Sequence, residues 1–326
     1  MKKFLSFIGK FLISIVILVL VAVLGFKVFD LVKHKDFYSN SEVAFNTPGA
    51  NDNFVQQGFD YVAEEEKFLV TGYMSDDTPS RVYVVNKDGS STFTKLLKED
   101  GSDYCGHTGG IVRNGDYVYI TGGNGLDVFS YADILEGKAT TKQLGSVRTY
   151  NNPAHCYIYD GYVFAGSFFI EEDYETPEYE RMTTPAGDEN KSVITVFKLD
   201  EGADFGIDPT PRAVLSTRRC VQGMCFTDDG KIVLSTSYGL STSQLFVYDT
   251  EKLTSVQDYD FRDFEDIPLY YLDSASLVEV IDAPPMAEEL VYLDGKIYVM
   301  NESACNKYIF GKITTGYNVY AYNYKK

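Results

Sequence analysis

The hydrophobic and polar positions of the chain follow one arrangement five times after residue 50. Each unit opens with a polar or glycine-rich segment that leads into an apolar run, and a polar turn separates this run from a second one. The opening segments lie at residues 57–62, 107–112, 153–158, 222–227 and 287–292. A third, aromatic-rich run follows at residues 81–89, 126–134, 192–200, 244–252 and 318–323. Several strands per unit, repeated at intervals of about 45–70 residues, predict a β-propeller.

The expected fold class is therefore all-β, with five blades as the prediction and six as the alternative. The fifth unit lacks a fourth run after residue 323, whereas residues 41–46 (SEVAFN) have strand character and precede the first unit. We expect residues 41–46 to supply the outer strand of the fifth blade, so that the two ends of the repeat array close the ring.

The first 36 residues differ from the rest. An uncharged run, residues 11–26 (FLISIVILVLVAVLGF), lies between Lys10 and Lys27, whose side chains can reach the lipid headgroups. It predicts one N-terminal transmembrane helix, and a cleaved signal peptide is the alternative. No small-residue cleavage pattern follows Gly25, which favours an uncleaved signal anchor. We expect residues 1–36 to form the anchor and linker, and residues 37–326 to form an extracytoplasmic propeller on a single-pass cell-membrane protein.

Charge separates the same two parts. The whole chain carries −18, the first 36 residues carry +4, and the remainder therefore carries −22. A domain this acidic repels nucleic acid and anionic headgroups, so a nucleic-acid partner is not expected. Acidic loops could attract a divalent cation such as calcium, which is the one candidate cofactor.

Several enzyme signatures are absent from the sequence. Tryptophan is missing, which argues against quinone-dependent dehydrogenase propellers with their repeated tryptophan motif. No GxSxG, GxGxxG or GxxxxGK motif occurs, and the five cysteines include no CxxC pair. Whether the chain is an enzyme stays open, with a binding protein favoured.

Strand direction predicts where polar groups converge. In each blade the first strand starts, and the second strand ends, at the same face of the propeller. This face should therefore carry a ligand-binding channel mouth formed by Gln57, Tyr73, His107, Arg148, His155, Arg218, Gln222, Tyr238, Glu288 and Glu302. The alternative is that these side chains only satisfy neighbouring backbone groups where the inner strands crowd the axis.

His107, His155 and Glu288 are the candidate metal ligands, because both histidines outside the anchor fall in opening segments. Two acidic stretches interrupt the repeats. Residues 168–191 lie between the second and third runs of the third unit and could cover the channel mouth. Residues 258–266 lack the glycine and final glutamate of a calcium-binding hand, and are expected to form a solvated loop or edge.

Some segments resemble a bacterial family of secreted or membrane-anchored propellers that has no assigned activity. The most specific are QG at Gln222 with STSYG at residues 235–239, and PPMAE at residues 284–288 with NESACNKY at residues 301–308. The resemblance implies glycine after Glu288, where this chain has Glu289. More distantly, the repeats are similar to calcium-dependent lactonases and strictosidine-synthase-like propellers. Their metal-binding set has no residue-by-residue match here, so no catalytic residue is carried over.

Two functions follow as hypotheses. The first is a membrane-tethered binding or interaction module that holds a small molecule, a peptide or an envelope polymer at the channel mouth. The second is a metal-assisted hydrolase or lyase with its site at the same mouth.

Overall fold

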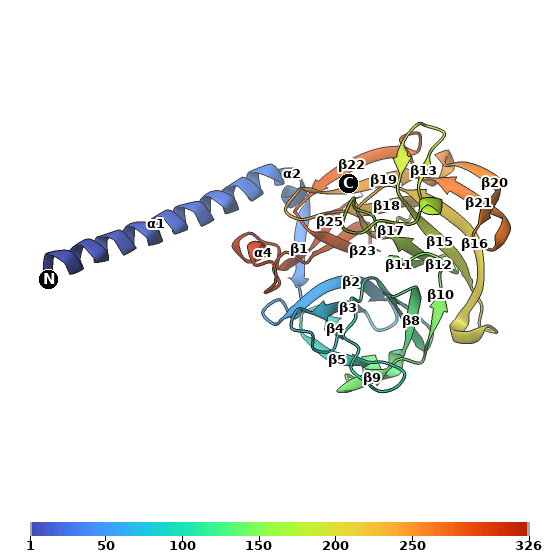
Figure 1. The fold of residues 1–326 in the computed structure, drawn as a ribbon, viewed down its shortest axis with the longest axis horizontal. Helices are drawn as coiled ribbons and strands as arrows, with labels where there is room; N and C mark the ends of the chain where they lie inside the picture. Colours follow the sequence, from blue (N-terminus) through green and yellow to red (C-terminus); the bar gives the residue numbers. More distant parts are fainter. Residues whose placement is uncertain (1, 325–326) are drawn as a thin grey trace.

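Five sheets arranged as the blades of a β-propeller make up most of the computed structural model, which describes residues 2–324 (Figure 1). The innermost strands are β2 (Phe54–Val62), β6 (Ile111–Asn114), β11 (Pro153–Tyr159), β17 (Val221–Phe226) and β23 (Ala287–Leu293). Each inner strand contacts the next, and β23 contacts β2, so the ring is closed. The predicted five-bladed propeller is confirmed.

Each blade continues outward as an antiparallel meander, as the alternating runs predict. Blade 1 adds β3 (Lys67–Met74), β4 (Arg81–Asn86) and β5 (Ser91–Leu97), and blade 2 adds β7 (Tyr117–Gly122), β8 (Gly125–Ser130) and β10 (Gly145–Arg148). Blade 3 adds β12 (Tyr162–Ser167), β15 (Ser192–Leu199) and β16 (Ile207–Thr217). Blade 4 adds β18 (Lys231–Thr236), β19 (Ser243–Asp249) and β22 (Leu277–Ala283).

Blade 5 closes the ring by strand exchange. Its second and third strands are β24 (Lys296–Asn301) and β25 (Asn318–Asn323), and its outer strand is β1 (Ser41–Asn46) from the N-terminal part of the chain. β1 pairs antiparallel with β25, from Ser41 opposite Tyr322 to Asn46 opposite Asn318. The predicted role of residues 41–46 is confirmed.

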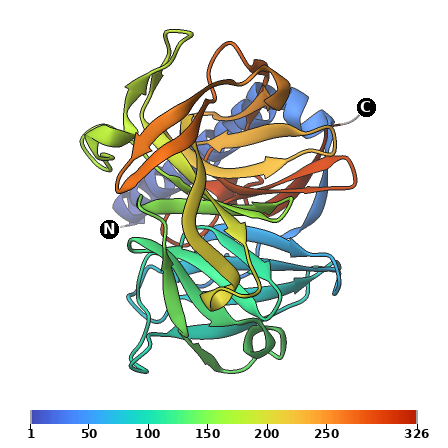
Figure 2. The ribbon, with the colours of Figure 1, turned by 90° about the vertical axis from the view of Figure 1, so that its right-hand side faces the viewer.

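Two insertions extend the outer edges of neighbouring blades. β9 (Thr140–Lys142), from the connection inside blade 2, pairs in parallel with β5 of blade 1. The hairpin of β20 (Thr254–Phe261) and β21 (Phe264–Tyr271) leaves blade 4 and pairs in parallel with β16 of blade 3, the long yellow strand at the front of Figure 2. Residues 258–266, expected to be a solvated loop or edge, form the turn end of this hairpin, and β20 is the mostly exposed edge strand of the sheet.

Apolar side chains fill the spaces between adjacent blades. One cluster between blades 4 and 5 includes Leu245, Leu290 and Tyr320, and another between blades 1 and 2 includes Leu69, Ile120 and Phe129. Both faces of a blade are buried in this arrangement, which explains why the strands have nearly continuous apolar runs.

The remaining elements are short, apart from the N-terminal helix. They are α1 (Lys2–Lys33), α2 (Lys35–Ser39), α3 (Tyr131–Leu135) and α4 (Phe310–Ile313), the 3₁₀ turns η1 (Glu178–Glu180), η2 (Asp204–Gly206) and η3 (Thr250–Lys252), and the small ribbon β13 (Met182–Thr183) with β14 (Glu189–Asn190). In α1, Phe7–Lys33 is long and apolar enough to cross a membrane, with a mean hydropathy of 2.9 in its apolar window; a signal sequence would meet the same criterion.

The end of α1 is fixed to the propeller by buried polar groups. His34 Nδ1 lies 3.0 Å from Asp30 Oδ1, and Tyr38 donates a hydrogen bond of 2.7 Å to the other oxygen of Asp30. His34 Nε2 lies 3.2 Å from the hydroxyl of Thr242, in the β18–β19 loop. The helix therefore leaves the propeller in a defined position, beside α4 (Figure 1).

Candidate functional site

Four of the predicted residues meet where the inner strands begin. Gln57 on β2 donates through Nε2 to Glu302 Oε2 at 2.8 Å, and Gln222 on β17 lies with its Nε2 3.5 Å from Glu288 Oε1. Glu302 directly follows β24, the second strand of blade 5, and Gln57 lies near the start of β2, the first strand of blade 1. A strand start and a strand end therefore meet at this face, as predicted. We call these residues, Gln57, Gln222, Glu288 and Glu302, the mouth group.

The mouth group contains two carboxyls that are almost fully buried. Only 2% of Glu288 and 9% of Glu302 is exposed. Burial raises the pKa of Glu288 well above its ordinary value, and the nearby charges of Glu302 and Glu289 raise it further. Burial also raises the pKa of Glu302 to about 7, while the hydrogen bond from Gln57 and the charge of Lys307 act in the opposite direction. The two carboxyls therefore do not both ionise readily near neutral pH.

Three rings and one ammonium group lie next to the mouth group, close enough for Tyr73, Tyr308 and Lys307 to act electrostatically with Glu302. Lys307 Nζ donates to the hydroxyl of Tyr73 at 2.6 Å and lies 4.9 Å from the centre of that ring and 5.2 Å from the ring of Tyr308. The ring of His107 lies 4.5 Å from the ring of Tyr73, at an interplanar angle of 31°. Two further predicted residues, Tyr73 and His107, thus belong to the mouth.

His107 is held as a neutral ring at the mouth. Part of its surface reaches solvent, but the protein atoms around it lower its pKa to about 4, and the charge of Lys307 acts in the same direction. A neutral imidazole can stack on Tyr73 beside an ammonium group without charge repulsion.

Beneath the mouth group, Glu289 lies on the propeller axis and joins three blades. Its carboxylate accepts backbone N–H hydrogen bonds from Phe59 (3.0 Å), Ile111 (3.0 Å) and Cys156 (2.9 Å), which are on the inner strands of blades 1, 2 and 3. Burial raises its pKa well above the ordinary value, and the three N–H donors oppose this shift. Glu289 therefore satisfies backbone donors that face the axis.

Glycines on neighbouring blades make room for Glu289. A Cβ on Gly223 of blade 4 would lie 2.3 Å from Glu289 Cα, and a Cβ on Gly110 of blade 2 would lie 2.8 Å from Glu289 Oε1. The resemblance implied glycine at position 289. The carboxylate fills the axis instead, and the close approach is provided by the glycines of the other blades.

His155 lies away from the mouth group, inside blade 3. It is fully buried, and its ring lies against Gly166 on β12, where a Cβ would be 2.1 Å from Nε2. Neither ring nitrogen has a hydrogen-bond partner within residues 2–324. Burial lowers the pKa of His155 to about 3, so the ring is neutral.

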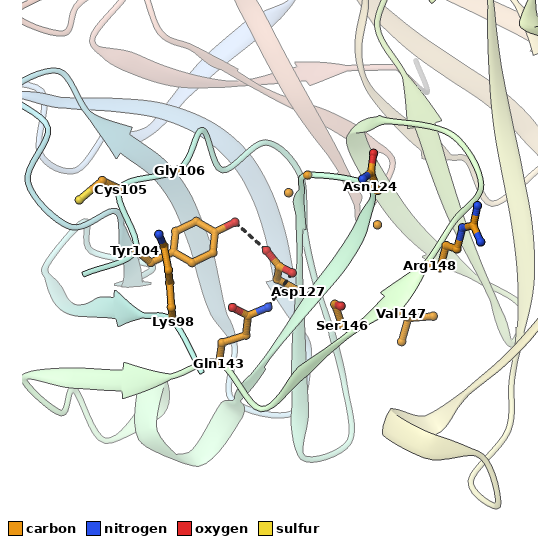
Figure 3. A pocket seen from close by; sticks show the side chains of 13 residues that line it. Lys98, Tyr104, Cys105, Gly106, Asn124, Asp127, Gln143, Ser146, Val147 and Arg148 are labelled. Atoms are coloured by element: carbon orange, nitrogen blue, oxygen red, sulfur yellow. Dashed lines mark hydrogen bonds between the residues drawn. The ribbon is translucent and has the colours of Figure 1, made fainter. Parts of the chain in front are cut away.

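Arg148 borders a separate pocket on the same face of the propeller (Figure 3). This cavity of about 630 Å³ lies between the segment before His107 and the turn at residues 122–125. Lys98 and Arg148 lie on opposite sides of it, and Asp127 lies between them. Asp127 accepts hydrogen bonds from Tyr104 (2.6 Å) and Gln143 (2.8 Å).

The structure also directs Arg218 and Tyr238 away from the mouth group. The Arg218 guanidinium lies 3.3 Å from the ring centre of Phe246 on β19. Tyr238 is exposed and donates a hydrogen bond to Asp173 in the 168–191 insertion. The insertion itself is tied to the β20–β21 hairpin by a hydrogen bond of 3.2 Å from the Tyr259 hydroxyl to the Tyr179 carbonyl. The hydrogen bonds described for the insertion join it to residues of blades 3 and 4 and not to the mouth group.

His107, His155 and Glu288 do not form a metal site in this structure. Across residues 2–324, no group of three or more histidine, cysteine, aspartate or glutamate side chains is placed to hold a metal ion. The five cysteines are free thiols, of which Cys105 is exposed and the others are buried.

Sequence reasoning missed Lys307, Tyr308 and Glu289. Lys307 and Tyr308 lie in the segment after β24, and only the NESACNKY resemblance marked it. Glu289 stood out as a departure from glycine, but a single sequence does not show that its side chain turns toward the axis.

Several solved structures are similar to this chain, all at low sequence identity. No family model and no curated protein matches this chain. Among solved structures, the PQQ-bound aldose sugar dehydrogenase of Streptomyces coelicolor shares 12% identity with a TM-score of 0.42, covering 86% of this chain and 95% of that one. An exo-β-1,3-galactanase of Phanerochaete chrysosporium shares 10% identity with a TM-score of 0.47, covering 86% and 63%. BamB of Moraxella catarrhalis shares 9% identity with a TM-score of 0.30, covering 79% and 69%.

Proposed function

We propose that the chain is a membrane-tethered binding module that holds its ligand at the channel mouth of an extracytoplasmic propeller. The observation that carries this proposal is the pair Glu288 and Glu302, buried together at the mouth. No lysine, arginine or histidine nitrogen lies within ion-pair distance of either carboxyl in residues 2–324. Burying two such groups side by side opposes folding.

Stability alone does not account for this pair. The blades are held by apolar layers and by Glu289, and apolar residues at the two positions would avoid the cost of burying carboxyls. Perturbed carboxyls at a propeller mouth are therefore candidates for ligand contact.

Contacts of α1 support a membrane-facing mouth. Phe26, at the end of the apolar run, lies 6.4 Å from Phe310 in ring-centre distance. Phe310 and Ile309 are 41% and 54% exposed, and they directly follow the segment that carries Lys307 and Tyr308. If α1 spans the membrane, these two apolar side chains lie level with the headgroups. The ligand would then be bound close to the membrane surface.

A ligand survey on the full chain in detergent micelles tests the proposal. Thermal melts are recorded with amines, sugars, short peptides and calcium, first on the wild type and then on the Glu288→Gln/Glu302→Gln double variant. A ligand that raises the melting temperature of the wild type and not of the double variant supports a site at the mouth. A matched control, Glu251→Gln/Glu265→Gln, changes two exposed carboxyls far from the mouth and should respond like the wild type.

The proposal fails if every stabilising ligand acts equally on the wild type and on the double variant. Protease treatment of intact cells tests the membrane part separately. Digestion of the propeller from outside supports the orientation, and protection of the propeller contradicts it.

A further inference from the structure

The side chain of Lys307 occupies the mouth and makes contacts there that a bound cationic ligand could also make. Its ammonium group donates to the Tyr73 hydroxyl at 2.6 Å, and so lies at the hydroxyl end of that ring, and it lies 5.2 Å from the centre of the Tyr308 ring. A hydroxyl acceptor beside an aromatic ring is a polar and polarisable environment that attracts a cation. Here the cation belongs to the protein itself.

Near this ammonium group lies the Glu302 carboxyl, which it does not reach as an ion pair. No carboxylate oxygen comes within 4.0 Å of Lys307 Nζ in residues 2–324, although its charge acts on Glu302. The rings and the tyrosine hydroxyl, rather than a salt bridge, therefore hold Lys307. Of the two carboxyls, Glu302 has a pKa of about 7 and is ionised in part at neutral pH, so it is the group that attracts positive charge at the mouth.

Lys307 can also leave this position at small cost. It is exposed, and it lies on the connecting segment between β24 and α4 rather than on a strand. The segment ends at Ile309, which has a left-handed backbone with a φ of 38°. Contacts of an exposed ammonium with ring faces are individually weak, so a competing cation can replace them.

We propose that Lys307 is an internal stand-in for a ligand ammonium group, and that the mouth binds a primary alkylammonium at the Tyr73 hydroxyl, beside Tyr308 and near Glu302. This inference rests on the proposed function and specifies its ligand class. A flexible aliphatic amine fits because the lysine side chain that now occupies the position is itself one. The ligand would displace Lys307 and take over its hydrogen bond to the Tyr73 hydroxyl and its attraction to ionised Glu302.

Replacement of the lysine by a free amine tests the inference. Lys307→Ala removes three methylene groups and the ammonium, which together correspond to n-propylammonium. Thermal melts of full-length Lys307→Ala in micelles are recorded with n-propylammonium chloride, and sodium chloride at equal ionic strength is the salt control. We expect saturable stabilisation of Lys307→Ala, with a half-saturating concentration at least tenfold lower than that of the wild type, where Lys307 competes.

Two further variants keep the test specific. Glu302→Gln combined with Lys307→Ala should lose the response, because the acidic attraction is reduced. Lys312→Ala removes another exposed lysine of the same region and should behave like the wild type. Equal responses of Lys307→Ala and the wild type, or a full response in the Glu302→Gln combination, would overturn the inference.

Failure of the inference and failure of the proposed function give different results. If a ligand without an amine stabilises the wild type through the Glu288 and Glu302 pair, and n-propylammonium has no specific effect, the function stands and the ammonium class is wrong. If n-propylammonium stabilises Lys307→Ala but no ligand in the survey acts through the pair, the ammonium site stands without the proposed function.

Discussion

The side-chain amide of Gln57 donates a hydrogen bond of 2.8 Å to Glu302 and thereby joins blade 1 to blade 5 at the channel mouth. The donor lies on the first inner strand of the ring, and the acceptor follows the second strand of the last blade. The contact therefore places a titratable group on the seam where the ring closes.

Stability should depend on pH through Glu302. Its pKa in the folded chain is raised to about 7, mainly by burial, whereas a glutamate in an unfolded chain has a pKa of about 4.3. The folded state then holds more protons between these values, so this group stabilises the fold most below about pH 4 and loses that contribution as the pH rises toward 7. Between pH 5 and 8 we expect the wild type to lose stability relative to Glu302→Gln. Urea midpoints of both proteins across this range give the comparison, and parallel curves would contradict it.

Glu289→Ala should destabilise the propeller strongly. The change leaves three buried N–H groups of three blades without an acceptor, and we expect a loss of about 3 kcal/mol or more in the free energy of unfolding. Glu289→Gln keeps one acceptor oxygen and should cost less. Glu265→Ala, on the exposed β20–β21 hairpin, is the control and should stay within about 0.5 kcal/mol of the wild type. A mild effect of Glu289→Ala in denaturant unfolding would show that water replaces the carboxylate.

His155 and Gly166 should be energetically coupled. Alanine at position 166 would place its Cβ 2.1 Å from His155 Nε2, so Gly166→Ala must displace the ring. Overpacking of this kind costs about 1–3 kcal/mol. In a His155→Ala background the same change should cost much less, which a double-mutant cycle measures. Gly202→Ala, at an exposed position without a positive φ, is the matched control. Additive effects of the two changes would contradict the packing described.

The strand at residues 41–46 should be needed for folding, whereas the residues before it should only add stability. A chain that begins at residue 37 keeps Phe37, which is buried against Tyr320 and Tyr322, and keeps β1. It should fold with reduced stability, because Tyr38 and the propeller lose Asp30 and His34. A chain that begins at residue 47 leaves the edge of β25 unpaired and should aggregate. Circular dichroism and size-exclusion chromatography distinguish the two, and a monomeric, folded 47–326 chain would refute the closure.

The repeat pattern predicted the blades because strand alternation and turn residues are local properties. It predicted the closure by β1 because the fifth unit lacked a fourth strand. It did not predict that β20 and β21 pair with β16, since nothing local in residues 258–266 indicates a parallel partner on another blade. The exposed positions of that hairpin carry acidic side chains, and the sequence of an acidic surface loop would look the same.

For the site, strand direction was sufficient to bring together Gln57, Gln222, Glu288 and Glu302, with Tyr73 and His107 beside them. Direction does not determine which side of a strand a side chain takes. His155 turns to Gly166 on the neighbouring strand of its own blade, Arg218 stacks on Phe246 of blade 4, and Glu289 turns to the axis to meet three other blades. Those choices depend on contacts that a single sequence does not reveal.

The central claim, that the mouth is a binding site for an alkylammonium group, is tested most directly by a crystal structure of Lys307→Ala grown with n-propylammonium. We expect density for the amine beside Tyr308, with its nitrogen directed at the Tyr73 hydroxyl and at Glu302. An unoccupied mouth at saturating amine, or amine bound only elsewhere on the propeller, would contradict the claim.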